Sequence, residues 1–163
     1  MKEPLIFQIL EWNQSYDIIE DEDEEDDNKK EQIFKIKLFG RTINNETIYV
    51  DVEDFKPYFY IEIPFEWYKD VDIKVGRFIT YLKSKVTQQG FYNYEIVEHK
   101  KFYGFTASKD FKFIKLIFTS FKTFKFYESW IKKNKLTDRA LVKNDTWLQL
   151  YESNIQPFIR CMH

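Results

Sequence analysis

The spacing of the apolar residues changes after Pro64, and this change limits the folds open to the chain. Before Pro64, short segments of branched and aromatic residues are separated by turn residues, a pattern typical of β-strands. After Pro64, apolar residues recur at the spacing of an α-helix, and they are Val71, Val75, Phe78, Ile79, Leu82 and Val86. Further strand-like and helical segments follow in turn. The pattern predicts an α+β protein.

Four strands are expected in the first 64 residues, and we expect them to form one small antiparallel sheet. They cover the segments LIFQILEW (5–12), QIFKIKLFG (32–40), ETIYVDVEDF (46–55) and YFYIEIP (58–64). The first two strands are expected to pair with each other. A turn at Asn44 and Asn45 is expected to lead into the third, because asparagine is common in tight turns. In the fourth strand, Phe59 is expected to face the core, with Tyr58 and Tyr60 on the other side.

An unbroken run of eight acidic residues, Glu20–Asp27, lies between the first two strands. Mutual repulsion and the lack of apolar residues predict a disordered loop over about residues 17–31. Two alternatives are a mimic of nucleic acid and a docking tail for a basic partner. A catalytic metal site is not expected there, because such sites hold a few carboxylates rigidly.

The second part of the chain reads as helix, strand, strand and helix. Gly90 suits a position just after the first helix, and strands are expected over 93–105, with a turn at Gly104, and over 112–120. Ser120 is a candidate cap for a helix running to about Lys133. The expected buried stripe of this helix consists of Phe121, Phe124, Tyr127 or Glu128, and Ile131.

A closing strand is expected near residues 140–142 or 147–150. Together with the strand at 58–64, residues 58–150 then follow the order of a ferredoxin-like unit, which is also the topology of the RNA-recognition motif. The terminal segment 151–163 predicts a short helix that opens at Ser153 or Asn154, since proline is tolerated at Pro157 in a first turn.

Charge is unevenly distributed along the chain. Residues 1–68 contain 7 basic and 18 acidic residues, whereas residues 69–163 contain 18 basic and 9 acidic ones. A lysine-rich face in the second part would attract phosphates in a salt-sensitive manner. In this part lysines alternate with aromatic rings, as in a groove for single-stranded nucleic acid, although packing of the rings in the core is the more common outcome.

The residues chosen as nucleic-acid contacts lie around one strand. Lys109, Lys112 and Lys115 are the candidates for phosphate contacts. Tyr103 and Phe111 are the rings expected to be exposed, because both border turns. Side-chain alternation places Lys112 and Lys115 on opposite faces of the strand.

The sequence offers little to catalysis or to metal binding. A single cysteine, Cys161, excludes an internal disulfide, and with His99 and His163 it falls short of a zinc site. The acidic groups Asp51, Glu53 and Asp54, and the lone Asp138 and Asp145, are interpreted as surface residues. No catalytic residue, metal or cofactor is therefore expected in this segment.

No apolar run reaches the roughly 18–20 residues of a membrane span, and the first residues do not resemble a secretory signal. A soluble, intracellular protein without membrane contact is expected. The oligomeric state is left open.

Four blocks of sequence carry a resemblance to a known family. They are FGRT (39–42) followed by VEDFKPYFYIEIP (52–64), then VEHKKFYGFT (97–106), KFIKLIFTSFKTF (112–124) and LYESNIQPFIRCMH (150–163). In this order they resemble the amino-terminal region of family B DNA polymerases, above all the eukaryotic delta type and its relatives in large DNA viruses. The resemblance covers about residues 33–163, and the acidic run has no counterpart in it.

The resemblance implies one amino-terminal domain over residues 1–163. Residues 1–64 would form a small β-barrel-like (OB-like) sheet, joined to the ferredoxin-like unit at 58–150 through the shared strand at 58–64. Residues 151–163 would be a connecting helix toward an exonuclease domain that follows His163. The implied interdomain contacts are Tyr151, Asn154, Ile155, Phe158, Arg160 and His163.

By this resemblance the segment would be a non-catalytic part of a DNA-directed DNA polymerase with 3'-5' exonuclease, whose Mg²⁺-binding carboxylate motifs are not found in these 163 residues. It would guide the single-stranded template and brace the exonuclease domain at a viral replication site, in the host nucleus or cytoplasm. Its partners would be single-stranded DNA and the remainder of the polymerase. The alternatives are a free-standing single-stranded nucleic-acid-binding module from a split polymerase and a protein-interaction module using the acidic loop.

Overall fold

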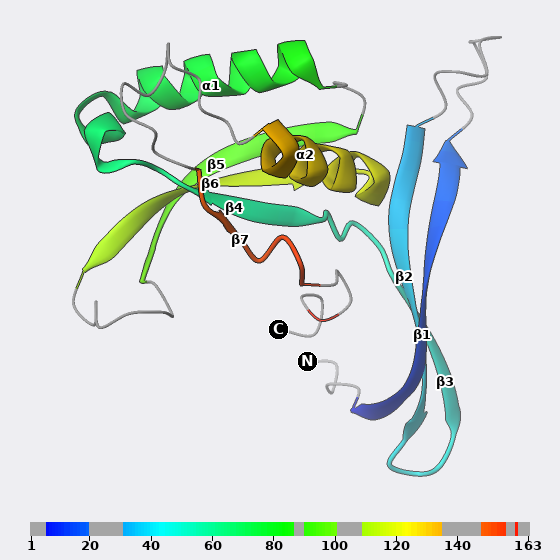
Figure 1. Cartoon of the computed structure of the whole chain (residues 1–163). Helices are drawn as coiled ribbons and strands as arrows, with labels where there is room; N and C mark the ends of the chain where they lie inside the picture. The colour runs from blue at the N-terminus through cyan, green and yellow to red at the C-terminus, as the bar shows by residue number, and fades with distance from the viewer. Residues whose placement is uncertain are drawn as a thin grey trace, which may run out of the picture. The chain divides into compact units, whose positions relative to one another are not determined.

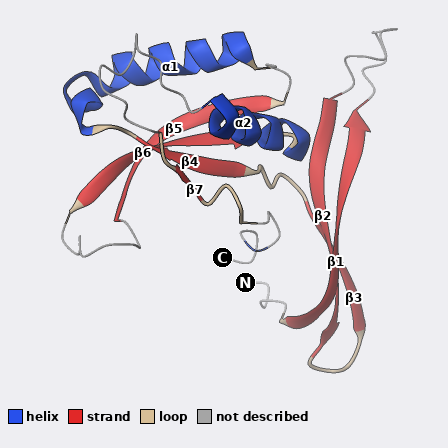
Figure 2. Ribbon diagram, viewed as in Figure 1, coloured by secondary structure: helices blue, strands red, loops and turns tan. Residues whose placement is uncertain are grey.

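The computed structural model describes residues 6–19, 31–86, 90–100, 109–134, 148–155 and 159. The chain divides into two compact units, one formed by Met1–Lys56 with Gln156–His163 and the other by Pro57–Ile155. Within the described residues there are two antiparallel sheets and two α-helices (Figures 1 and 2), and the expected α+β class is confirmed.

The first unit contains a three-stranded antiparallel sheet in the order β1-β2-β3. Its strands are β1 (Phe7–Ile19), β2 (Glu31–Thr42) and β3 (Thr47–Val52). The expected pairing of the first two strands and the turn before the third are confirmed. The turn contains Asn45 at a φ of 67°, a left-handed conformation that asparagine tolerates better than most residues.

The first two strands approach closely at Gly40. A Cβ atom at this position would lie 2.3 Å from the carbonyl oxygen of Gln8, so no larger residue fits without a shift of the backbone. The register of β1 against β2 changes between Ile9 and Glu11, close to this contact. Glycine therefore permits the close approach where the ladder is irregular.

The expected loop over residues 17–31 is too long. Strand β1 continues to Ile19, where it pairs with Glu31 at the start of β2. Backbone hydrogen bonds extend the hairpin beyond the apolar residues on which the prediction rested, because a ladder needs no apolar side chain. The acidic run itself lies outside the described residues.

The expected four-stranded sheet is also wrong. Strand β4 (Tyr58–Glu62) pairs with β6 and β7 in the second unit, and β1, β2 and β3 form a separate sheet. Asp54 has a φ of 60° and interrupts the extended backbone between β3 and β4. In the described part of the first unit the sheet is open, with β1 and β3 at its edges, and does not close into a barrel.

The second unit contains a four-stranded antiparallel sheet in the order β5-β6-β4-β7. Along the chain its elements are β4, a 3-10 helix η2 (Phe65–Asp70), α1 (Val71–Lys85), β5 (Phe91–Lys100), β6 (Asp110–Phe118), α2 (Phe121–Asn134) and β7 (Leu150–Tyr151). The predicted order of strands and helices is confirmed, whereas η2 is not anticipated by the sequence patterns.

Both helices cover the same face of this sheet (Figure 1) and form the main core with it. The strands supply Phe59, Ile61, Ile63, Ile114, Leu116 and Phe118, and the helices supply Val75, Phe78, Ile79, Leu82, Phe124, Tyr127 and Ile131. Each such side chain contributes about 1.5–3 kcal/mol by leaving water. The predicted stripes of both helices are confirmed, with Tyr127 and Glu128 both buried.

Gly90 lies where the chain returns from α1 to β5. Its φ is +77°, and a Cβ atom there would lie 2.6 Å from Oγ1 of Thr123 on α2. Its carbonyl accepts a hydrogen bond from the backbone N–H of Thr119, at 3.0 Å. Glycine therefore meets both a conformational and a steric requirement at this position.

The end of the second unit departs from expectation. The closing strand β7 overlaps the expected 147–150 segment at Leu150 alone, and residues 140–142 lie outside the described part of the chain. At Ser153 and Asn154 the chain makes a turn instead of opening a helix. Glu152 has a φ of 59°, which a helix does not permit, and its carbonyl accepts the N–H of Ile155 at 3.2 Å.

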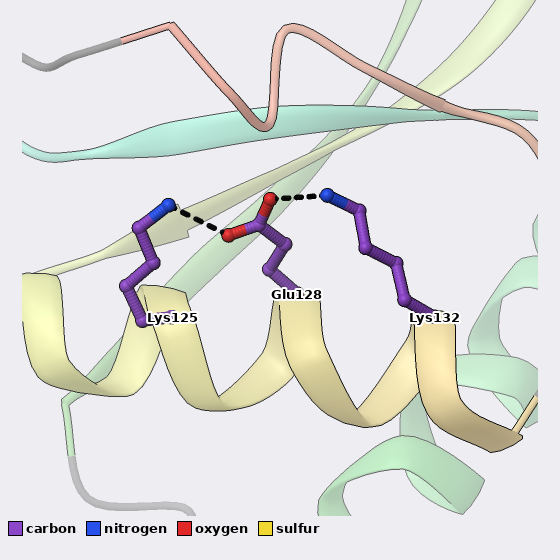
Figure 3. A network of polar contacts seen from close by, with 3 residues as sticks. All are labelled: Lys125, Glu128 and Lys132. Atoms are coloured by element: carbon purple, nitrogen blue, oxygen red, sulfur yellow. Dashed lines mark hydrogen bonds and ion pairs between the residues drawn. The ribbon is translucent and has the colours of Figure 1, made fainter.

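A buried carboxylate lies on the core side of α2. Glu128 is 5% exposed, and its oxygens accept hydrogen bonds from Nζ of Lys125 at 2.8 Å and of Lys132 at 2.6 Å (Figure 3). Ser153, in the turn after β7, also hydrogen-bonds to it. Burial alone would raise the pKa of Glu128, but the hydrogen bonds from the two lysines and from Ser153 outweigh it and lower the pKa. The group thus ties the end of the unit to α2.

Replacing Glu128 with glutamine tests this tie. The amide nitrogen would face a lysine as a second donor, so we expect E128Q to lower the free energy of unfolding by about 1.5–3 kcal/mol at pH 7. The stabilisation is present above the unfolded pKa of 4.5 and disappears as the pH falls through the lower folded value. Urea unfolding at pH 7 and at acidic pH measures it.

The matched control is E98Q, which removes an exposed ion pair to Lys112. Exposed pairs contribute about 0–1 kcal/mol, so a small change is expected there. A difference between wild type and E128Q that stays constant from pH 7 to acidic pH would contradict the role of the carboxylate charge.

Candidate nucleic-acid interface

Two of the three predicted lysines meet aromatic rings of η2. Nζ of Lys109 lies 4.6 Å from the ring centroid of Phe65, which is 49% exposed. Nζ of Lys112 lies 5.6 Å from the ring of Tyr68, and the backbone N–H of Lys112 donates to the Tyr68 hydroxyl at 2.8 Å. Cation–π contacts of this kind contribute about 0.5–1 kcal/mol at exposed sites.

The rings of Phe65 and Tyr68 are missed by the sequence analysis. Their signal is the segment FEWYKD after Pro64, in which aromatic and charged residues are mixed without a strand or helix period. A 3-10 helix gives no clear period in the sequence, because it is short and has three residues per turn.

Phe111 is buried, so its expected exposure is wrong. It is 5% exposed, and its ring centroid lies 5.7 Å from that of Phe65. The 3-10 helix thus contacts the beginning of β6 through this pair of rings. Tyr103, the other ring chosen as exposed, lies outside the described residues.

Lys115 lies on the face of the sheet opposite to Lys112. Lys112 shares its face with the core residues Ile114 and Leu116, and Lys115 lies on the face without helices, as the alternation of a strand requires. Nζ of Lys115 is 3.3 Å from a carboxylate oxygen of Glu95 and 4.7 Å from the ring of Tyr58. The three chosen lysines therefore do not form one surface.

The face of the sheet without helices has a small aromatic core of its own. The Tyr60 and His99 rings lie 5.7 Å apart, and the Phe113 and Tyr151 rings lie 5.3 Å apart. Phe113 is only 4% exposed although it faces away from the helices. The predicted burial of Phe59, with tyrosines on the opposite side, is confirmed. On this opposite face these tyrosine and phenylalanine rings are half-buried or buried, whereas Glu95 and His99 are exposed.

Tyr151 closes this aromatic group at the sheet edge. Its hydroxyl donates to a carboxylate oxygen of Glu62 at 2.8 Å, and burial together with this carboxylate raises the pKa of Tyr151. Tyr127, in the main core, has its pKa raised to about 12 by burial. Both hydroxyls are therefore protonated donors at neutral pH.

Among the described residues of the second unit, most of the basic side chains lie on the two α-helices. Strands β4, β5, β6 and β7 together contain three basic and four acidic residues. Helices α1 and α2 contain eight basic and two acidic ones. The basic side chains are Lys74, Arg77, Lys83, Lys85, Lys122, Lys125, Lys132 and Lys133. Positive potential is thus concentrated on the side of the sheet that bears the helices.

The acidic residues considered for catalysis are exposed, as expected. Asp51, Glu53 and Asp54 lie at the end of β3 and just after it. Glu53 forms an ion pair with Lys35, with 3.0 Å between Oε1 and Nζ, and Asp51 accepts a hydrogen bond from the Tyr49 hydroxyl. Among the described residues, no three His, Cys, Asp or Glu side chains come together as a metal site. Asp138, Asp145, Cys161 and His163 lie outside that part of the chain.

No family model matches the chain. Its sequence is 31% identical over 170 residues to the DNA polymerase of Acanthamoeba polyphaga mimivirus, covering 96% of this chain and 9% of that protein. The DNA polymerase of Phaeocystis pouchetii virus is 30% identical over 84% of this chain, and that of Pyramimonas orientalis virus 29% identical over 96%. The chain is related to the DNA polymerases of large DNA viruses.

The predicted resemblance to viral polymerases is therefore confirmed. The chain spans about a tenth of the length of these relatives, 9%, 14% and 12% in the same order. The fold agrees with a family B DNA polymerase from the hyperthermophilic archaeon Pyrobaculum calidifontis, with a TM-score of 0.52, 16% identity, and coverage of 96% of this chain and 16% of the other.

Of the six residues predicted to contact another domain, three lie in the described part of this chain. Tyr151 is half-buried in β7, Asn154 is exposed and Ile155 is half-buried in the turn that follows. Phe158, Arg160 and His163 lie outside the described residues. No described helix is long and apolar enough to cross a membrane.

The burial of Phe111 can be tested by truncation. We expect F111A to lower the free energy of unfolding by about 3–5 kcal/mol, the usual cost of removing a buried phenylalanine ring. The matched control is F126A on α2, whose ring is 55% exposed and should cost much less. Urea unfolding of both variants measures the two losses of stability, and equal small losses would contradict the burial of Phe111.

Proposed function

We propose that the chain is the non-catalytic amino-terminal domain of a viral family B DNA polymerase. The observation that carries the proposal is similarity along 84–96% of this chain to viral DNA polymerases of which it spans only 9–14%. In this role the domain guides the single-stranded template and braces the exonuclease domain. Polymerase chemistry, and the Mg²⁺ ions that such chemistry uses, would belong to other parts of the whole protein.

The second unit supports a ferredoxin-like, RNA-recognition-like assignment. Its elements follow the order strand, helix, strand, strand, helix, strand, and its first and third strands, β4 and β6, are the central pair. The OB-like interpretation of the first unit rests on the family resemblance. The proposed domain is one functional piece over residues 1–163, although its two compact units meet at Pro57 rather than sharing the strand at 58–64.

Charge supports template guidance by the second unit. Its helices have a marked excess of basic residues, and a basic surface attracts the phosphates of nucleic acids without reading their sequence. Phosphate contacts by Lys109, Lys112 and Lys115 remain predictions, as does stacking by Tyr103. Lys112 and Lys115 already form ion pairs with Glu98 and Glu95.

Bracing of an exonuclease domain would use the end of the second unit. Tyr151 holds β7 to β4 through Glu62, and Ser153 joins the next turn to Glu128. These contacts fix the direction in which the chain leaves the sheet. Residues 151–163 would then contact the exonuclease domain, with the same side chains as the resemblance implies.

Binding of labelled nucleic acids to the 163-residue protein tests template guidance. We expect fluorescence anisotropy to show binding of single-stranded DNA at low salt, with the logarithm of the affinity falling by about 0.7 per phosphate contact for each tenfold rise in salt. Single-stranded RNA and duplex DNA are measured alongside. Absence of binding to all three at low salt would reject template guidance.

Bracing is tested separately in a whole polymerase related to this chain. Deleting the segment equivalent to residues 1–163 should lower the melting temperature of the exonuclease domain. An unchanged exonuclease melting temperature would reject bracing and leave the binding result unaffected.

A further inference from the structure

We infer that the outer surface of α1 and α2 is the phosphate-binding surface of this domain for single-stranded nucleic acid. We call this surface, formed by six of the basic side chains of the two helices, the helix layer. The inference rests on the proposed function, because it assumes that the domain binds a single strand. It assigns this binding to residues other than the strand lysines that the sequence favours.

The basic residues of the helix layer form two stripes. On α1, Lys74, Arg77 and Lys85 follow one another at helical spacing, and on α2 Lys122, Lys125 and Lys133 do the same. Each stripe covers eleven residue steps, which corresponds to about 16 Å along a helix. Arg77 and Lys85 on α1 and all four lysines of α2 are exposed.

The two stripes belong to one surface. The Tyr81 ring of α1 lies 6.2 Å from the Trp130 ring of α2, so the helices are in contact. Both lie on the same face of the sheet (Figure 1) and share its core. A polyanion lying across the helices would therefore meet cations from both.

Acidic groups do little to reduce the potential of this surface. Glu128 is buried, and its charge is shared between Lys125 and Lys132, which leaves this trio with a net positive charge facing solvent. Asp72 lies in the first turn of α1, where the helix dipole stabilises it. The two helices have six more basic than acidic residues, and Arg77, Lys85, Lys122 and Lys133 are exposed and lie outside the Glu128 network.

The strand lysines are in a different situation. Lys112 is 3.3 Å from a carboxylate oxygen of Glu98, and Lys115 is at the same distance from one of Glu95. A phosphate would have to displace these carboxylates. By contrast, Arg77, Lys122 and Lys133 have no ion pair to any other residue that the structure describes.

A base-stacking ring is also present in the helix layer. Phe126 is 55% exposed and lies one turn after Lys122 on α2, between the lysines of its stripe. An exposed ring among cations is the arrangement that single-strand-binding proteins use, since the ring stacks on a base and the cations contact the backbone. This combination favours a single strand over other polyanions and implies little sequence preference.

A charge-reversal variant of the full 163-residue protein tests the inference. We expect K122E/K133E to weaken binding of a fluorescein-labelled oligothymidylate of about 20 nucleotides, longer than most single-strand sites. The loss should be at least about tenfold at low salt, and the slope of log affinity against log salt should fall by about 1.4, corresponding to two phosphate contacts. Both residues are exposed, so the fold should be retained, as circular dichroism will show.

Two other double variants carry the same change in net charge. K69E/K100E alters exposed lysines outside both helices and should change the affinity less than about threefold. K109E/K115E alters two of the lysines chosen from the sequence and should also retain most of the binding. If K122E/K133E does not fold, K122Q/K133Q replaces it. This variant carries about half the change in net charge and should change the slope of log affinity against log salt by the same amount.

The outcomes separate the two proposals. Loss of binding in K109E/K115E with retention in K122E/K133E would overturn the helix-layer inference and leave template guidance standing. Equal losses in all three charge-reversal variants would also overturn it, because they would show an effect of net charge alone. If the wild-type protein does not bind the oligothymidylate, template guidance fails and the inference fails with it.

The Phe126 ring has its own test. F126A should lower the affinity for oligothymidylate by roughly fivefold to a hundredfold, the range of one stacked base, with little change in the salt slope. F65A, which removes another half-exposed ring outside the helix layer, is the matched control. A loss with F65A and none with F126A would place stacking at η2 and contradict this part of the inference.

Discussion

The second unit depends on the burial of two helical stripes against one face of its sheet. Strands β4 and β6 supply the apolar floor, and each helix adds the side chains that its spacing places on one side. Because this burial uses the apolar sides of α1 and α2, their opposite sides are left to solvent and are basic. The same packing that stabilises the unit therefore also determines where its positive charge is displayed.

Much of this arrangement is readable from the sequence, and the reasons are local. The helices follow from apolar residues at a period near 3.6, and the pairing of β1 with β2 follows from two alternating segments. The assignment of β4 to the second sheet could not be read in this way, because side-chain alternation does not identify a strand's neighbour. Likewise, the ladder that extends to Ile19 depends on backbone hydrogen bonds, which leave no mark in composition.

The candidate interface was less predictable than the fold. Lysines that alternate with aromatic rings in β6 predict a binding surface, yet Lys112 and Lys115 lie on opposite faces of the sheet and pair with glutamates of β5, the preceding strand. Phe111 is buried and contacts Phe65 of η2, an element without a periodic signal. The exposure and the ion pairs of a side chain depend on the assembled sheet. The sequence pattern of one strand predicts them only when a neighbouring strand is already known.

The strand order also bears on how the chain reaches its fold. The central pair, β4 and β6, joins Tyr58 to Ile117, and β7 brings Tyr151 to Tyr60. Contacts between such distant positions form slowly, because the intervening chain must be ordered first. During synthesis β4 leaves the ribosome well before either of its neighbours. Until β6 and β7 have been made, the backbone edges of β4 have no partner strands in the nascent chain.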